Sequence, residues 1–219
     1  MARELVFYTH PMSRGRIARW MLEETGQPYR TEVLDYGTTM KSAAYLAINP
    51  MGKVPALSHG DVVVTECAAV CAYLADAFPE TGLAPAIDDP LRGAYYRWLF
   101  FGAGPVEAAT TNKAFGFDVP LERRGMAGYG SLDDVVRVLE SAVSPGPYLL
   151  GERFSTADVY LGSQITWGLA FGTMEKRPAL EAYARRIGSR PAAVRAKELD
   201  DALAAEHPIP AAKQQEAGG

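Results

Sequence analysis

The chain has 219 residues, of which 48% are hydrophobic and 22% are charged, a balance typical of a globular protein with a packed core. Its 22 basic and 26 acidic residues give a net charge of −4. A mildly acidic chain lacks the excess of basic residues that binds a polyanion, which argues against a nucleic-acid-binding protein. The hydrophobic fraction argues against a disordered protein.

The cysteines and histidines exclude two further classes. Cys67 and Cys71 are the only cysteines, which excludes a disulfide scaffold. The three histidines are scattered and no zinc-ligand spacing occurs, so we expect no metal. The first residues have no apolar signal core, and no stretch approaches the ~18 apolar residues of a membrane span. We therefore expect a protein of the reducing cytoplasm with no membrane partner.

The first third of the chain alternates between strand and helix patterns. Residues 5–8 are a short apolar run, and helical spacing follows from Ser13 until a Gly-Gln-Pro stop at 26–28. Residues 29–34 favour a second strand, 42–48 a short helix, 54–57 and 62–64 a hairpin, and 68–78 another helix. This β-α-β-α-β-β-α order predicts a small mixed sheet, since the crossover implies parallel pairing and the hairpin antiparallel pairing.

The remainder of the chain is helical by its spacing. We predict an α/β domain at 1–80, a linker at 81–88, an all-α domain at 89–207 and a mobile tail at 208–219. The run Gly102-Ala-Gly-Pro105 predicts a kink in the first helix of the second domain. Ser155 and Asp158 have the spacing of a capping box, so we expect Asp158 to be structural.

Four separate motifs, taken in this order, resemble the glutathione transferase family. They are the strand-loop-helix at 8–19, the run Asn49-Pro-Met-Gly-Lys-Val-Pro-Ala-Leu57, Thr65-Glu66-Cys67 at a helix start, and Phe154-Ser-Thr-Ala-Asp158. The resemblance covers about residues 4–203. It implies a thioredoxin-like N-terminal domain that binds glutathione, a helical C-terminal domain that helps to hold a second substrate, and a homodimer.

Ser13 is the first candidate catalytic residue. Ser is a favoured helix N-cap, and a helix N-terminus carries roughly half a positive charge, which stabilises a nearby thiolate. In the serine-type transferases, a Ser after the first strand donates a hydrogen bond to the glutathione thiolate, and Ser13 occupies that place. Tyr8 stays open as the alternative, because some family members use a Tyr at the end of the first strand. His10, on the same loop, is expected to be solvated.

The resemblance also implies which residues hold glutathione. A cis Val54–Pro55 bond would expose the backbone of Val54 to the cysteinyl part of glutathione, and Lys53 would meet a carboxylate. Glu66 would hold the γ-glutamyl ammonium. Cys67 stands where the family usually has Ser, so its backbone N–H would carry more of the contact with the α-carboxylate, since a thiol is a weak donor.

Two sets of residues have weaker assignments. Trp98, Gly102 and Pro105 share a helix face by their spacing and are candidates for the pocket of a hydrophobic second substrate. Arg14, Arg16 and Arg19 are expected to form a mostly solvated helix face.

The function that we expect is conjugation of the glutathione thiolate to hydrophobic electrophiles. The alternatives are a glutathione-dependent peroxidase or disulfide reductase, and a non-catalytic binding module.

Overall fold

The computed structural model describes residues 3–208, which form two compact units. Among these residues, the first unit comprises 3–81 and 191–208, and the second comprises Gly82–Arg190. The boundary after Thr81 falls at the start of the predicted linker. The predicted tail lies outside the described residues from 209 onward.

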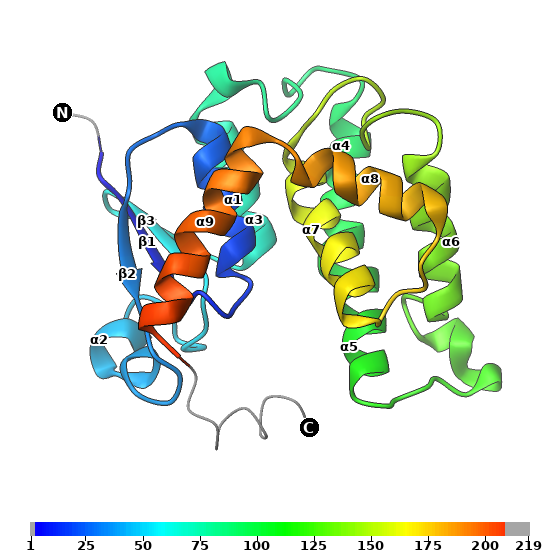
Figure 1. Ribbon diagram of the computed structural model, residues 1–219, viewed down its shortest axis with the longest axis horizontal. Coiled ribbons are helices and arrows are strands. Elements are labelled where there is room, and N and C mark those ends of the chain that lie inside the picture. Colours follow the sequence, from blue (N-terminus) through cyan, green and yellow to red (C-terminus); the bar gives the residue numbers. More distant parts are fainter. Residues whose placement is uncertain (1–2, 209–219) are drawn as a thin grey trace. The chain divides into compact units, whose positions relative to one another are not determined.

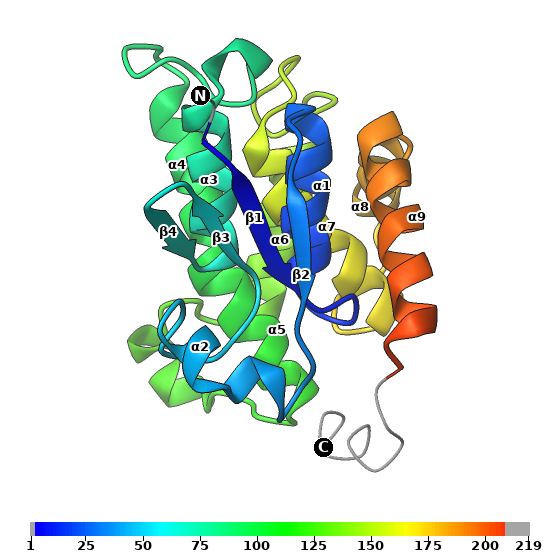
Figure 2. The same cartoon turned by 90° about the vertical axis from the view of Figure 1, so that its left-hand side faces the viewer.

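The strands of the first unit form a four-stranded mixed sheet in the order β2-β1-β3-β4 (Figure 2). The strands are β1 (Leu5–Thr9), β2 (Arg30–Val33), β3 (Ala56–His59) and β4 (Val62–Thr65). β1 pairs in parallel with β2 and antiparallel with β3, and β3 pairs antiparallel with β4. The mixed sheet expected from the element order is therefore confirmed.

The helices α1, α2 and α3 follow the predicted order, and the first unit has three further helices. Together they are α1 (Gly15–Thr25), η1 (Thr39–Lys41), α2 (Ala43–Leu46), α3 (Cys67–Ala77), η2 (Pro79–Thr81) and α9 (Pro191–Glu206). α1 ends at Gly26, whose φ of 64° is the left-handed cap that the Gly-Gln-Pro stop predicted. Phe7 packs against Tyr29 and the Arg19 side chain of α1, whereas its neighbour Tyr8 packs in a cluster with Met40 and Tyr45. The two faces of β1 are therefore both covered.

The last helix packs with the first unit, which differs from the expected grouping of residues 89–207 in one helical domain. α9 lies beside α1 (Figure 1), and Arg19 Nε donates to Asp200 Oδ1 at 2.7 Å. Both side chains are buried. The expectation of a solvated arginine face is therefore wrong for Arg19, because α9 covers that part of α1.

The second unit is helical, as expected. Its helices are α4 (Arg92–Phe101), η3 (Gly102–Val106), α5 (Glu107–Ala114), η4 (Leu121–Met126), α6 (Leu132–Val143), α7 (Thr156–Phe171) and α8 (Pro178–Gly188). The capping box before α7 is present, and Asp158 also accepts hydrogen bonds from Leu149 N and Tyr183 Oη. Asp158 therefore has the structural role that was predicted. No helix within residues 3–208 is both long and apolar enough to cross a membrane.

The predicted kink at 102–105 is a π-helical turn, η3. A π turn interrupts the 3.6-residue spacing. The regular helix face that the spacing of Trp98, Gly102 and Pro105 predicted is therefore interrupted at this turn. Gly102 is buried, and a Cβ built on it would lie 2.9 Å from the ring of Tyr160 in α7. Glycine is thus required there for close packing of α7.

Candidate functional site

The register of the sheet brings three predicted site segments to one end of the first unit. Tyr8 pairs with Ala56, and Ala56 pairs with Thr65 on its other side. The loop after β1, the residues before β3 and the residues after β4 therefore all leave the sheet at this end. α1 and α3 both begin here, so two positive helix N-termini meet in the same place.

The loop after β1 carries Ser13, whose side chain is half-buried. The Ser13 hydroxyl donates to the carbonyl oxygen of His10 at 2.6 Å and accepts from Gly15 N at 2.9 Å. The N-cap residue of α1 is therefore Arg14 and not Ser13 as predicted; the Ser13 hydroxyl instead satisfies the first backbone N–H of the helix from the position before the cap. A hydroxyl has one proton, so a thiolate near Ser13 would have to compete with the His10 carbonyl for it.

His10 is buried and not solvated as expected. Its Nδ1 accepts from Met12 N at 3.1 Å, and its ring lies 4.6 Å from the ring of Tyr36 between centroids. Burial lowers the pKa of His10 below 6.5; the nearby Asp35 opposes this shift and His207 adds to it. The sequence signal that could have suggested burial is weak, because Tyr36 lies 26 positions further along the chain.

Gly15 sets how closely α1 approaches the end of β1. A Cβ built on Gly15 would lie 1.9 Å from Thr9 Oγ1 and 2.9 Å from Ser13 Oγ. Real Cβ atoms do not tolerate such contacts, so a side chain at position 15 would displace Thr9, Ser13 or the helix. Sequence reasoning missed this requirement because Gly15 shows no turn or cap pattern.

The Val54–Pro55 peptide bond is cis, as the resemblance implied. Within residues 3–208, the Val54 backbone has no hydrogen-bond partner. The preceding turn is held by the buried side chain of Asn49: its Nδ2 donates to Lys53 O at 2.8 Å, and its Oδ1 accepts from Met51 N at 3.0 Å. Tyr45 Oη also donates to Lys53 O. The backbone at 53–54 is thus fixed, while the Lys53 side chain is exposed.

Glu66 and Cys67 begin α3. Glu66 is exposed and has φ 66°, the only positive φ of a non-glycine residue within residues 3–208. Non-glycine residues rarely adopt this conformation, and such strain concentrates at functional sites. The buried Cys67 thiol donates to the carbonyl oxygen of Arg14 at 3.5 Å, which joins the start of α3 to the Ser13 loop.

Cys71 lies one turn further along α3, is fully buried, and has its pKa raised by a hydrogen bond with Cys67 and by burial. Both cysteines are free thiols. Cys71 therefore belongs to the core, behind the candidate site.

Tyr8 is directed away from α1, into the cluster on the other face of the sheet. Its ring lies 5.7 Å from the ring of Tyr45, and its hydroxyl accepts from Ser58 Oγ at 3.4 Å. Because successive strand residues point to opposite faces, Tyr8 lies opposite Phe7, which faces α1. Ser13 and Tyr8 are thus held in different surroundings.

Comparison with known proteins identifies the family. Residues 12–77 match the profile described as glutathione S-transferase, N-terminal domain. Glutathione S-transferase GstA of Escherichia coli O157:H7 is 30% identical over 164 residues, which cover 74% of this chain and 78% of that protein. The chain belongs to the glutathione S-transferase family. The three segments that the sheet brings together are three of the four motifs on which the sequence resemblance rested.

Solved transferase structures have the same fold. A glutathione transferase from Methylococcus capsulatus str. Bath has a TM-score of 0.76 at 30% identity, over 90% of this transferase and 99% of that chain. A theta class glutathione S-transferase from Xanthomonas axonopodis pv. citri was solved with glutathione bound. It has a TM-score of 0.71 at 28% identity, over 89% of this transferase and 97% of that chain. The thioredoxin-like domain followed by a helical domain is therefore confirmed.

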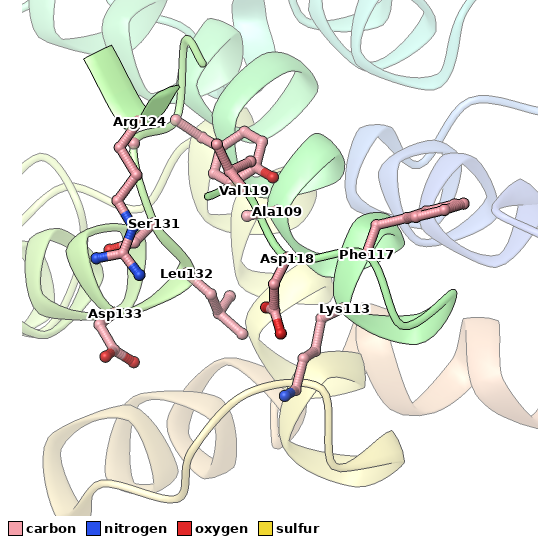
Figure 3. Close-up of a pocket in the computed structure, with 11 residues that line it drawn as sticks. Ala109, Lys113, Phe117, Asp118, Val119, Arg124, Ser131, Leu132 and Asp133 are labelled. Atoms are coloured by element: carbon pink, nitrogen blue, oxygen red, sulfur yellow. The ribbon is translucent and has the colours of Figure 1, made fainter. Parts of the chain in front are cut away.

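The predicted second-substrate residues all lie in the second unit of the transferase. Trp98 is buried and its ring contacts Phe101, Gly102 packs on Tyr160, and Pro105 is half-buried inside η3. A cavity of about 220 Å³ lies elsewhere in this unit, between α5, the segment at 117–124 and the start of α6 (Figure 3). None of the predicted site residues lines this cavity.

Proposed function

We propose that this protein is a glutathione transferase with a serine-type site, in which Ser13 stabilises the thiolate of glutathione. The observation that carries the proposal is the position of the Ser13 hydroxyl at the N-terminus of α1, where Gly15 N donates to it. The hydroxyl proton, which the His10 carbonyl oxygen accepts at 2.6 Å in this structure, would turn to the sulfur when the thiolate is bound. The helix dipole favours the same negative charge.

The other segments at this end of the sheet supply a complementary set of groups for the tripeptide. The unpaired backbone of Val54 can add to an extended peptide as a further strand would. Lys53 offers a cation to a carboxylate. Glu66 offers an anion to the γ-glutamyl ammonium, and the first N–H groups of α3, at Cys67, can donate to the adjacent carboxylate.

The reaction that follows from these roles is attack of the thiolate on an electrophilic carbon of a hydrophobic compound: a C–S bond forms while a leaving group departs with its electron pair, or while a polarised double bond opens and takes a proton from water. The protein contributes proximity and a lowered thiol pKa, both of which increase the rate. A hydroxyl at position 13 cannot form a disulfide with glutathione. This favours conjugation over the alternative of peroxide or disulfide reduction, in which a thiol at this position would take part.

The test is a comparison of Ser13→Ala with Tyr8→Phe. Loss of a hydrogen bond to a charged group is worth about 1.5–3 kcal/mol, so Ser13→Ala should slow conjugation at neutral pH by roughly ten- to a hundredfold. Tyr8→Phe should change the rate little. Loss of the rate in Tyr8→Phe together with a normal rate in Ser13→Ala would assign the tyrosine-type mechanism instead.

Retention on glutathione-agarose, with elution by free glutathione, distinguishes any of these enzymes from a module that does not bind glutathione.

We further propose a homodimer in the reducing cytoplasm. The two free thiols fit a reducing compartment. The first unit exposes Val62 and Val63 on β4, and the second exposes Tyr96 and Phe100 on α4. Exposed apolar side chains of this kind on regular elements favour an interface with a second copy.

A further inference from the structure

The backbone just before Ser13 is held on both sides by aromatic residues. Met12 N donates to His10 Nδ1 at 3.1 Å, and Met12 O accepts from Tyr36 Oη at 3.0 Å. The two rings that supply these groups are in contact, with centroids 4.6 Å apart. The ring pair of His10 and Tyr36 thus holds both polar backbone groups of Met12.

The backbone of His10 contacts the Ser13 side chain directly. Ser13 Oγ donates to the His10 carbonyl oxygen at 2.6 Å. His10 therefore acts at two points, with its ring on Met12 and its carbonyl on the hydroxyl itself. The partners of the His10 ring, Met12 and Tyr36, do not touch glutathione in the proposed function, so the contacts of the ring can serve a purely geometric role.

We propose that the His10 imidazole is a positioning group for Ser13: together with Tyr36 it holds the Met12 backbone and thereby sets where the Ser13 hydroxyl lies. This inference rests on the proposed function of Ser13. His10 does not act on glutathione itself, because its ring is buried against Tyr36 and its Nδ1 is already occupied.

The protonation state of the ring is part of this role. Because Nδ1 accepts the Met12 N–H, it carries no proton, and the neutral ring has its proton on Nε2. An imidazolium would place an N–H on Nδ1, opposite the N–H of Met12, and the hydrogen bond would be lost. The contact therefore requires a neutral ring.

The surroundings of His10 favour the neutral ring. Burial lowers the pKa of His10 below 6.5, with Asp35 opposing the shift and His207 adding to it. Asp35 Oδ1 also lies 3.5 Å from His207 Nδ1. The charged and titratable groups that surround the ring and its loop are Asp35, Tyr36 and His207, with Arg14 and Arg16 at the start of α1.

The sign of the pH dependence follows from this direction. A histidine whose pKa is lower in the folded state contributes stability that is fully present above pH 6.5 and lost as the pH falls below that value. The same protonation releases Met12. The transferase should therefore lose rate below pH 6.5 beyond the loss that the titration of the thiol itself causes.

The test compares two substitutions of similar size in the full-length protein. His10→Asn keeps an acceptor at the position of Nδ1, whereas His10→Leu has the same branching and no polar atom. His10→Leu should lower kcat by about two- to tenfold, the effect of one hydrogen bond, with a smaller change in the Kd for glutathione, and His10→Asn should retain most of the rate. The ratio of wild-type to His10→Asn rates should fall below pH 6.5, because Asn does not titrate.

Amide hydrogen exchange at Met12 gives a second readout that does not depend on chemistry. Exchange should be faster in His10→Leu than in wild type and His10→Asn. Equal rates and equal exchange in the Leu and Asn variants would overturn the positioning role, even where Ser13→Ala is slow and the proposed function stands. If Ser13→Ala keeps the wild-type rate, the proposed function is wrong, and the exchange at Met12 alone then supports or overturns the role of His10.

Discussion

At the scale of single residues, Glu66 and Cys67 begin the same helix with different surroundings. The Glu66 carboxylate is exposed at the end of the sheet, whereas the Cys67 thiol is buried and directed to the Arg14 carbonyl. A side chain that already has a partner inside the protein contributes little to a ligand. The contribution of Cys67 to glutathione binding should therefore come from its backbone N–H.

This difference predicts unequal effects on glutathione affinity. Glu66→Gln removes a charge-assisted hydrogen bond worth about 1.5–3 kcal/mol and should raise the Kd for glutathione by roughly tenfold or more. Cys67→Ala leaves the backbone N–H in place and should change the Kd by less than about threefold, under 1 kcal/mol. Isothermal titration calorimetry measures both. A larger loss in Cys67→Ala than in Glu66→Gln would show that the thiol contacts the ligand.

The residues that sequence reasoning found and missed at this site differ in a physical way. Ser13 and Glu66 stand at helix starts, where local spacing reveals the capping and dipole chemistry. His10 and Gly15 depend on Tyr36 and Thr9, which reach them only through the fold. A residue whose role depends on a contact formed only by folding leaves no pattern among its neighbours in the sequence. The roles of His10 and Gly15 could therefore not be predicted.

At the scale of elements, the contact of α1 with β1 depends on the absence of a side chain at position 15. Gly15→Ala would place its Cβ 1.9 Å from Thr9 Oγ1 and should destabilise the protein by about 1–3 kcal/mol, the usual cost of overpacking. Gly93→Ala is the matched control, because this helical glycine has no atom within 4 Å of a built Cβ.

Urea unfolding distinguishes the two glycines. Gly93→Ala should be neutral or stabilising by less than about 1 kcal/mol, since alanine has the higher helix propensity. Gly15→Ala should also slow conjugation under conditions in which it is fully folded, because Ser13 Oγ lies 2.9 Å from the same Cβ position. Equal unfolding midpoints for the two variants would contradict the close approach of α1 to β1.

The placement of α9 depends on a buried ion pair that the sequence did not reveal. Arg19 and Asp200 are separated by 181 positions, and neither motif nor spacing joins them. Arg19 Nη2 and Asp200 Oδ2 are buried without a hydrogen-bond partner among the described residues. Burial raises the pKa of Asp200 despite the opposing effect of Arg19, so pairing does not fully offset the cost of desolvation.

This ion pair predicts strong coupling between the two side chains. Arg19→Met or Asp200→Leu alone leaves one uncompensated buried charge and should cost about 3–5 kcal/mol of unfolding free energy. The double variant should regain most of that loss, because it removes both charges. Denaturant unfolding of all four proteins gives the coupling energy; additive losses in the double variant would show that the two groups do not act as a pair.

At the scale of the whole molecule, local signals predicted most of the elements. The hairpin, the left-handed Gly26 cap and the capping box at Ser155 all depend on neighbours within a few residues. The unit to which α9 belongs, and the π turn in place of a simple kink, depend on packing between distant segments. These were the points at which the expected domain bounds and the expected pocket face differed from the structure.

The proposed homodimer predicts a particle of twice the 23.7 kDa chain mass by light scattering at micromolar concentration. Phe100→Glu, on the exposed face of α4, should shift it toward the monomer. Phe171→Glu is the control, because Phe171 is equally exposed, at 77% against 73%, on α7. A wild-type particle of 23.7 kDa would contradict the dimer, and dissociation by both variants would remove α4 as the specific contact.

The central claim, that Ser13 stabilises the thiolate, is tested most directly by the pKa of glutathione bound to the protein. Ultraviolet absorbance of the thiolate, titrated against pH, measures it in wild type and in Ser13→Ala. In wild type it should lie below the ordinary thiol value of about 8.5, and Ser13→Ala should raise it by about one to two pH units. An unchanged pKa in Ser13→Ala, with a rise in Tyr8→Phe, would contradict the claim.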